Sequence, residues 1–396
     1  MIPRTNYLNK LIGFKDKQLI KIVTGIRRCG KSTLLKMFQD YLLRAGTAPA
    51  QILSINFEEP ENKELTDWES LYNYIKKALV PKKKNYIFLD EIQNVGDYER
   101  AVNGLFIREN TDLYLTGSNA WMFSGEIATL LSGRYVEIPM LPLSFKEYCS
   151  IFPQQDLRRK YRDYLINSSF PYTLELGENR DLIRDYLGGI YNTIILKDVV
   201  ARKKIGDVLM LESVIRFLFD NIGNISSTKK ITDTLVSMGR KISVHTVEQY
   251  LSALTDSFIL YRMKRFDVKG KMHLKTGDKY YLADLGLRYF LLGSKDADQG
   301  RMLENVIFLE LLRRGYELYS GKVNSAEVDF VAVKDGYPEY YQAALTVRDR
   351  ETLERELSSL REIPNHNPKF LLTLDEDPPA SYNGIRQINA LDWLLE

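Results

Sequence analysis

The segment with the clearest chemical meaning is residues 25–32, which read Gly-Ile-Arg-Arg-Cys-Gly-Lys-Ser. It matches the pattern G-x-x-x-x-G-K-[ST], it follows a strand-like apolar run, and it opens a helical pattern. Glycines let such a loop curl until successive backbone N–H groups point at phosphate oxygens, and the helix N-terminus adds its dipole. We therefore expect a nucleotide to bind here through its phosphates. The expected binding residues are Gly25, Arg27, Arg28, Cys29, Gly30, Lys31, Ser32 and Thr33.

Three residues of this loop have distinct expected roles. Lys31 is expected to reach the β- and γ-phosphates of ATP, and Ser32 is expected to bind Mg²⁺. Cys29 occupies a position that is often small in such loops. Its thiol is either activated by the helix N-terminus or simply fills space, and we favour the second interpretation.

A second motif, residues 87–91, is an apolar strand pattern that ends in two carboxylates, Asp90 and Glu91. Asp90 suits the Mg²⁺ shell, and Glu91 suits orienting and deprotonating an attacking water. A glutamate beside the metal carboxylate favours water over a substrate hydroxyl as the nucleophile. The pair therefore indicates ATP hydrolysis rather than a kinase reaction.

Two further polar positions follow later strand patterns. Ser118 or Asn119, at the end of the strand around residues 113–115, either orients the water or begins a helix. Arg134 closes a helix just before another strand. It is either a surface cation or an arginine finger that a neighbouring subunit receives.

Strand and helix patterns alternate along the first part of the chain. Strand patterns fall at residues 19–23, 52–57, 86–89, 113–115 and 136–138. This alternation predicts an α/β fold in which a parallel sheet carries helices on both faces. The phosphate loop and the carboxylate pair then both lie at strand ends.

Together these motifs resemble the prokaryotic AAA+ ATPases that carry a C-terminal domain of unknown function. The resemblance extends over nearly the whole chain. It rests on residues 24–32, 55–58, 88–93, 115–120, 131–135 and 142–148. It implies a sensor-1 role for Asn119, a switch position at Asn56 and a trans finger at Arg134. It also implies ring or filament assembly, so a homo-oligomer is expected.

The middle of the chain has helix–turn–helix spacing at residues 231–238 and 243–256, followed by strand patterns at 258–261 and 280–282, as in a winged helix. Residues 196–290 carry 17 Lys and Arg against 10 Asp and Glu. This balance favours DNA contact through phosphates, although a packing or assembly module is the alternative. The basic side chains concerned are Lys229, Lys230, Arg240, Lys241, Arg262, Lys264, Arg265, Lys269, Lys271 and Lys275.

The tail resembles the restriction-endonuclease-like fold, in which a helix Glu and strand carboxylates hold Mg²⁺ beside a lysine. The corresponding residues are Glu304, Glu327, Asp329 and Gln342. The lysine position of that pattern is Ala344, so we expect a domain used for binding or docking rather than cleavage. Lys322 or Lys334 could replace the missing lysine from another position.

Composition bounds the remaining possibilities. The chain has 396 residues, 44% hydrophobic and 27% charged, which excludes a disordered or low-complexity protein. At about 150 residues per domain, we expect an ATPase domain at 1–150, a helical lid and winged helix at 151–295, and a nuclease-like domain at 296–396. Two cysteines and three histidines exclude a disulfide scaffold and a Cys/His-rich zinc site. No apolar run is long enough for a membrane span, and the N-terminus does not resemble a signal peptide, so a cytoplasmic location without membrane contact is expected.

The sequence thus predicts a Mg²⁺-dependent, AAA+-type ATP hydrolase that couples turnover to action on DNA. Two alternatives stay open: a nucleotide-controlled switch that gates a protein partner in signalling or defence, and an ATP-regulated nuclease. The basic middle favours DNA, and Ala344 counts against the nuclease.

Overall fold

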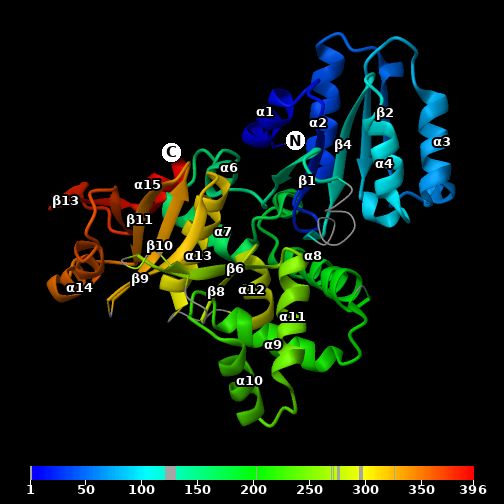
Figure 1. The fold of residues 1–396 in the computed structure, drawn as a ribbon. Helices are drawn as coiled ribbons and strands as arrows, with labels where there is room; N and C mark the ends of the chain where they lie inside the picture. Colours follow the sequence, from blue (N-terminus) through cyan, green and yellow to red (C-terminus); the bar gives the residue numbers. More distant parts are fainter. Residues whose placement is uncertain are drawn as a thin grey trace. The chain divides into compact units, whose positions relative to one another are not determined.

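The computed structural model describes residues 2–120, 131–201, 203–268, 270, 272–273, 277–293, 298–324 and 326–396. Contacts divide the chain into two units (Figure 1). Unit 1 is residues 1–142 with 256–258, and unit 2 is residues 143–255 with 259–396. Each unit has its own sheet.

The sheet of unit 1 has five strands in the order β2-β3-β4-β1-β5, and every pairing is parallel. The strands are β1 (Ile20–Thr24), β2 (Ile52–Asn56), β3 (Asn85–Asp90), β4 (Thr111–Gly117) and β5 (Tyr135–Pro139). The carboxyl ends of parallel strands lie at one edge of the sheet, so β1 and β3 deliver the phosphate loop and the carboxylate pair to that edge. The predicted parallel α/β sheet is confirmed.

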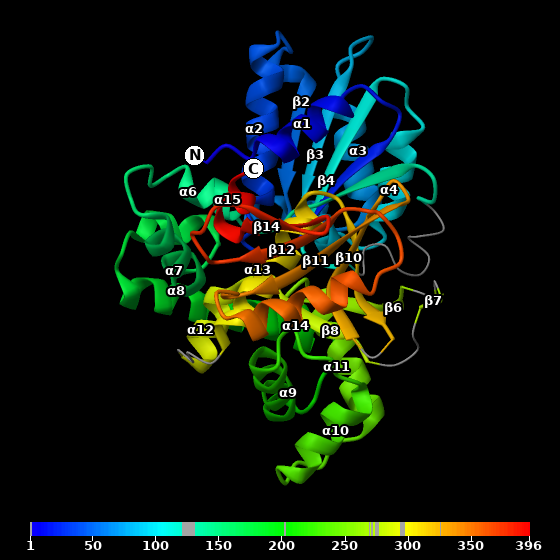
Figure 2. The same cartoon turned by 90° about the vertical axis from the view of Figure 1, so that its left-hand side faces the viewer.

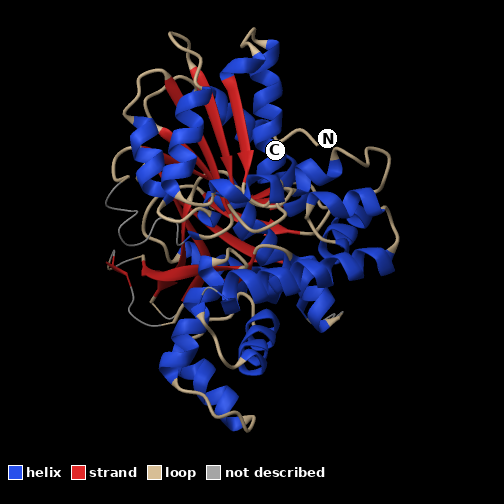
Figure 3. Cartoon of the chain, turned by 90° about the vertical axis from the view of Figure 1, so that its right-hand side faces the viewer, coloured by secondary structure: helices blue, strands red, loops and turns tan. Residues whose placement is uncertain are grey.

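Helices cover both faces of this sheet because its strands are apolar on both sides (Figure 3). On one face Leu89 and Leu115 share a core with α3 (Trp68–Ala78) and α4 (Tyr98–Phe106). On the other face Tyr114 packs against Phe38 of α2, with ring centroids 4.8 Å apart. Helices α1 (Thr5–Gly13) and α2 (Lys31–Arg44) pack against each other. Successive side chains of the buried strands thus pack against helices on opposite faces of the sheet. This packing fixes the edge of the sheet at which the two motifs lie.

Unit 2 begins with helices. They are α6 (Phe145–Cys149), α7 (Leu157–Asn167), α8 (Arg180–Thr193), the π-helix η6 (Ile194–Ala201), α9 (Val208–Asp220), α10 (Thr228–Ser237), α11 (Val244–Asp256) and α12 (Leu285–Leu292). Buried Asp284 caps α12 and accepts hydrogen bonds from Ser168 Oγ at 2.9 Å and Ser169 N at 2.7 Å. Gly286 allows this contact, since a Cβ there would lie 2.4 Å from Ser168 Cβ.

The sheet of unit 2 is mixed and runs β13-β14-β12-β11-β10-β9-β6-β7, with β8 paired to β6 (Figure 2). Its strands are β6 (Leu260–Asp267), β7 (Met272–His273), β8 (Lys279–Leu282), β9 (Glu317–Val323), β10 (Ala326–Lys334), β11 (Tyr337–Ala344), β12 (Lys369–Thr373), β13 (Ala380–Tyr382) and β14 (Ile385–Asn389). Its helices are α13 (Gln299–Arg313), α14 (Arg350–Arg361) and α15 (Ala390–Leu395).

The strands expected to form a wing do pair antiparallel, as β6 with β8. Strand β6 also pairs in parallel with β9, from Lys264 opposite Tyr319 to Asp267 opposite Lys322. The hairpin is therefore part of the large sheet. Backbone hydrogen bonding is continuous across the expected domain boundary at residue 295.

Candidate nucleotide-binding site

The loop between β1 and α2 has a backbone that only glycine fits at two positions. Gly25 has φ +147°, and a Cβ there would lie 2.1 Å from the Met140 carbonyl oxygen. Gly30, the N-cap of α2, has a left-handed conformation with φ +105°. The predicted loop geometry therefore depends on both glycines of the motif.

A residue that the sequence did not single out supports this loop. Arg4 is buried, and its guanidinium donates to the carbonyl oxygens of Cys29 at 3.1 Å and Leu141 at 2.7 Å. Cys29 is fully buried, and burial raises the pKa of its thiol, in keeping with a space-filling role. A lone arginine before the first helix matches no motif, so only the three-dimensional structure identifies Arg4.

Lys31 lies at the start of α2 with a buried side chain. Its Nζ is 3.1 Å from the Gly25 carbonyl oxygen and 3.4 Å from Glu91 Oε1. The two residues that follow, Ser32 and Thr33, are exposed. The structure thus places the loop lysine directly beside the second motif and leaves the adjoining hydroxyls accessible.

Asp90 is the last residue of β3, and its side chain is buried. Burial raises the pKa of this carboxyl group, while hydrogen bonds from the hydroxyls of Ser32 and Thr116 oppose that shift. Thr116 Oγ1 also accepts a hydrogen bond from the Glu91 N–H at 2.8 Å. The Ser32 hydroxyl and the Asp90 carboxylate are hard oxygen donors, which fit Mg²⁺.

Glu91 has a left-handed backbone with φ +55°, and its side chain is also buried. Its Oε2 accepts hydrogen bonds from Ser118 Oγ at 3.0 Å and from Gln93 Nε2. Burial by itself raises the pKa of Glu91. The positive charges of Lys31 and Arg27, with these two hydrogen bonds, outweigh burial and hold the pKa below its usual value. Glu91 is therefore ionised at neutral pH, as a general base must be.

The remaining predicted positions of unit 1 lie at different places. Asn119 is buried just beyond β4, next to Ser118. The Asn56 side chain, at the end of β2, accepts from the Glu58 N–H at 3.0 Å. Arg134 immediately precedes β5 at the opposite edge of the sheet, where its carbonyl accepts from Ile20 N, the first residue of β1. Its guanidinium bonds Asn103 and cannot reach the loop of its own chain.

The predicted carboxylates of the tail converge in unit 2. Lys279 Nζ, on β8, lies 2.8 Å from Glu304 Oε1 and from Glu327 Oε1, and 3.5 Å from Asp329 Oδ1. Lys279 was missed because it comes from the strand expected to form the wing. Of the candidates considered, Lys334 Nζ instead donates to the Arg314 carbonyl oxygen at 3.0 Å.

Other atoms of this cluster are satisfied by protein groups. The Tyr281 hydroxyl donates to Glu304 at 2.6 Å, and Gln342 Oε1 accepts from the Asp329 N–H at 3.2 Å. Burial and the nearby charge of Glu304 raise the pKa of Asp329 to about 7. Across the part of the chain that the structure describes, no group of three or more His, Cys, Asp or Glu side chains is arranged to hold a metal ion.

The basic residues of the middle are largely at the surface. Lys229, Lys230, Arg240 and Lys241 are exposed around α10 and the turn that follows it. Arg262 forms an ion pair with Asp278 at 2.6 Å. Lys269, Lys271 and Lys275 lie outside the described residues.

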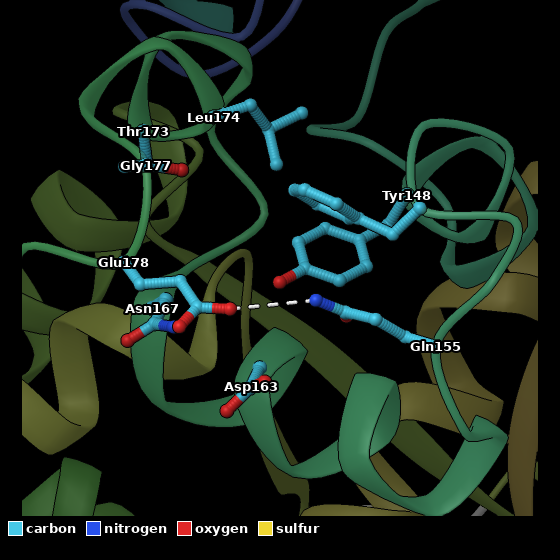
Figure 4. A pocket seen from close by; sticks show the side chains of 9 residues that line it. Tyr148, Gln155, Asp163, Asn167, Thr173, Leu174, Gly177 and Glu178 are labelled. Atoms are coloured by element: carbon cyan, nitrogen blue, oxygen red, sulfur yellow. Dashed lines mark hydrogen bonds between the residues drawn. The ribbon is translucent and has the colours of Figure 1, made fainter.

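Unit 2 also contains hollows between its helices. Figure 4 shows one of about 20 Å³ beside Tyr148, where Gln155 Nε2 donates to Glu178 Oε1 at 3.4 Å. That volume holds about one water molecule. A larger cavity of about 420 Å³ is lined by α7, α8 and α12, with Arg180 and Arg184 among its side chains. Among the described helices, none has the length and apolar character needed to cross a membrane.

Comparisons with known proteins show the family of this chain. A family described as "AAA domain" matches residues 17–149, and a family described as "Domain of unknown function (DUF8612)" matches residues 158–298. The chain belongs to the P-loop ATPases in which an AAA domain is followed by a DUF8612 domain.

Its relatives span nearly the same length. An uncharacterized protein of Haemophilus influenzae is 40% identical over 100% of this chain and 99% of its own length. Another, from Methanocaldococcus jannaschii, is 30% identical over 90% of this chain and 82% of its own length. A solved structure, the Walker-type ATPase of Pyrococcus abyssi, matches with a TM-score of 0.50 at 15% identity and covers 74% of this chain and 96% of that protein. At that identity the likeness concerns the fold alone.

Proposed function

We propose that this AAA-domain protein is a Mg²⁺-dependent ATP hydrolase in which water attacks the γ-phosphate in line. The observation that carries the proposal is the meeting of two motifs at one edge of the sheet. Lys31 Nζ of the loop lies 3.4 Å from Glu91 Oε1, next to Asp90. A phosphate-binding cation, a metal-binding carboxylate and an ionised base are the groups that this reaction needs.

The chain's own residues divide the work as follows. The N–H groups of the loop and Lys31 hold the phosphates. Lys31 exchanges Glu91 Oε1 and the Gly25 carbonyl for phosphate oxygens, which carry more charge. This exchange leaves Glu91 Oε1 free to accept a proton from water.

Ser32 and Asp90 are the residues that would hold Mg²⁺. When bound, the ion supplies positive charge that offsets the charge developing on the phosphate oxygens. Burial raises the pKa of Asp90, and an adjacent cation favours its ionised form. Asn119 is proposed as the sensor of the γ-phosphate. Arg134 is proposed as a finger for a neighbouring copy, because it is exposed at the edge of the sheet opposite its own loop.

We propose that turnover acts on DNA through the exposed basic residues around α10. Phosphate contacts of this kind weaken as salt rises. The supporting observation is that Lys229, Lys230, Arg240 and Lys241 are all exposed on one helix and the turn beyond it.

The test measures ATP hydrolysis with and without duplex DNA. Glu91→Gln should keep ATP binding and lower kcat by about 10²- to 10⁴-fold, as expected for loss of a general base. Glu64→Gln, an exposed carboxylate on the same unit, is the matched control and should behave as wild type. Wild-type turnover by Glu91→Gln would disprove the assignment of the base.

The DNA arm uses the same assay. Changing Lys229, Lys230, Arg240 and Lys241 to Glu should abolish stimulation by DNA while basal turnover stays unchanged. If stimulation persists in that variant, DNA acts elsewhere. If wild-type protein shows neither stimulation nor salt-dependent binding, the protein-gating alternative replaces the DNA proposal.

A further inference from the structure

The surroundings of Glu91 contain one side chain, Gln93, to which neither the motif nor the family resemblance assigns a role. Glu91 starts a single 3₁₀ turn, η3 (Ile92–Asn94), and this turn brings Gln93 back toward the glutamate. Gln93 Nε2 donates to Glu91 Oε2 and lies 3.4 Å from Ser118 Oγ, which donates to the same carboxylate oxygen at 3.0 Å. Glu91 Oε2 thus accepts from two side chains that fix the orientation of the carboxylate.

The other end of the Gln93 amide is unsatisfied. Its Oε1 is buried and has no hydrogen-bond partner among the described residues. A buried carbonyl oxygen without a donor costs free energy, so its retention calls for an explanation. It can only accept a hydrogen bond, and a water molecule is one donor that could supply it once the site rearranges to bind phosphate.

Glu91 Oε1 and Gln93 Oε1 can both accept hydrogen bonds from one water molecule. When Lys31 moves to phosphate, Glu91 Oε1 is left without its ion-pair partner. Gln93 Oε1 then offers a second acceptor belonging to a side chain already bonded to that carboxylate. A water held by both acceptors gives one proton to the base and keeps the other in a hydrogen bond, which fixes the direction of its lone pair.

We propose that Gln93 is the positioning residue of the attacking water. Its amide N–H orients Glu91, and its carbonyl oxygen accepts a hydrogen bond from the O–H of the water that does not give its proton to Glu91. This inference rests on the proposed ATP hydrolysis. It also differs from the role that the resemblance implies for Asn56. The Asn56 amide oxygen accepts from the Glu58 N–H, and its Nδ2 lies 3.4 Å from Glu59 Oε1.

The experiment compares Gln93→Leu with Asn56→Ala, using Asn94→Ala as a control from the exposed end of the same turn. Gln93→Leu should lower kcat by about 10- to 100-fold, with the dissociation constant of a fluorescent ATP analogue within about threefold of wild type. It should also move the acidic limb of the kcat/KM profile to higher pH, because Glu91 loses a donor that stabilises its charged form. If Gln93 did not donate to Glu91, its replacement would leave that limb in place.

A second variant keeps the test informative if Gln93→Leu binds ATP poorly. Gln93→Glu has nearly the same shape but replaces the donor with a charge, so it should shift the limb further in the same direction. Asn94→Ala should retain the wild-type profile. Wild-type kcat and pH profile in both Gln93 variants would overturn the inference, as would loss of turnover confined to Asn56→Ala.

Failure of this inference differs from failure of the proposed function. If wild-type protein does not hydrolyse ATP, or if Glu91→Gln retains full activity, the proposed function itself fails. If Glu91→Gln blocks turnover while both Gln93 variants match wild type, the ATPase stands and only the role of Gln93 is lost.

Discussion

Each unit has a buried lysine that forms an ion pair with a carboxylate, but the two lysines have different surroundings. Lys31 touches one carboxylate, Glu91, at 3.4 Å, and otherwise contacts backbone carbonyls. Lys279 contacts Glu304 and Glu327 at 2.8 Å each. A lysine with one long ion pair can exchange that pair for a phosphate. A lysine inside a carboxylate cluster cannot move away without leaving several negative charges unpaired. We therefore expect Lys31 to exchange its ion pair for a phosphate and Lys279 to keep its carboxylate partners.

The pKa of Lys279 also reflects its several carboxylate partners. Burial lowers the pKa of this ammonium, but the charges of Glu304, Asp329 and Glu327 outweigh burial and raise it above the usual value. Lys279 is therefore charged at neutral pH. Because its side chain is only 4% exposed, water screens these ion pairs little.

The largest expected contrast comes from replacing each lysine with methionine. Lys31→Met should lower ATP affinity about 100-fold or more. It should lower the unfolding midpoint of unit 1 less than Lys279→Met lowers that of unit 2, because it breaks one ion pair of 3.4 Å and leaves one buried carboxylate, Glu91, without its partner. Lys279→Met should destabilise unit 2 by about 3 kcal/mol, since the largely buried carboxylates of Glu304 and Asp329 lose their counter-charge. Lys264→Met, an exposed lysine on neighbouring β6, is the control. An unshifted midpoint in Lys279→Met would show that the cluster does not hold unit 2 together.

Sequence patterns predicted much of unit 1 for physical reasons. Buried parallel strands are continuous apolar runs, and the motifs sit at their ends, so loop, strand β3 and carboxylate pair were all located from short stretches. Lys279 could not be found in this way. Lys279 reaches Glu304 because β8 pairs with β6 and packs against α13. A contact between segments so far apart leaves no repeating pattern in the sequence.

The same limit explains two details of unit 1. Gln93 reaches Glu91 only because the glutamate has a left-handed backbone and begins a tight turn. Arg4 supports Cys29 from 25 positions away in sequence. A motif specifies which residue types the chemistry needs, but it does not show which side chains orient them: Gln93 does so from within the run 88–93, and Arg4 from outside any motif.

A smaller contrast is expected in the pH dependence of the two units. The folded pKa of Asp329 is raised to about 7 from the model-peptide value of 3.8. The folded protein then binds more protons than the unfolded chain between these values, so the stability of unit 2 should fall as pH rises from 5 to 7 and level off above. The slope is at most about 1.4 kcal/mol per pH unit. The pKa of Glu91 is lowered, so Glu91 stabilises unit 1 above its unfolded-state pKa and this stabilisation is lost only at more acidic pH. The contribution of Glu91 to the stability of unit 1 should therefore stay constant between pH 5 and 7.

Unfolding midpoints measured at several pH values check this prediction. Asp329→Asn should remove the slope of unit 2, while Asp335→Asn, an exposed carboxylate in the turn after β10, should keep it. A slope that survives Asp329→Asn would assign the titration to another group.

The smallest expected signal is metal binding at the cluster of unit 2. Lys279 already lies within 3.5 Å of all three carboxylates. Tyr281 donates to the same Glu304 oxygen as Lys279, and the Ala343 N–H donates to Asp329 Oδ2. A divalent cation would have to displace a buried ammonium, which is unfavourable, so the cluster should bind Mn²⁺ no more tightly than about 1 mM and should not cleave DNA.

Electron paramagnetic resonance titration of Mn²⁺ measures this in the full chain carrying Asp90→Asn, which removes the proposed metal carboxylate of unit 1. Free Mn²⁺ should rise in step with the amount added, and plasmid DNA should stay intact with Mg²⁺. A stoichiometric site that disappears in Glu304→Gln would contradict the prediction. It would mean that Lys279 yields to a metal as Lys31 is proposed to yield to phosphate, and that both units exchange partners.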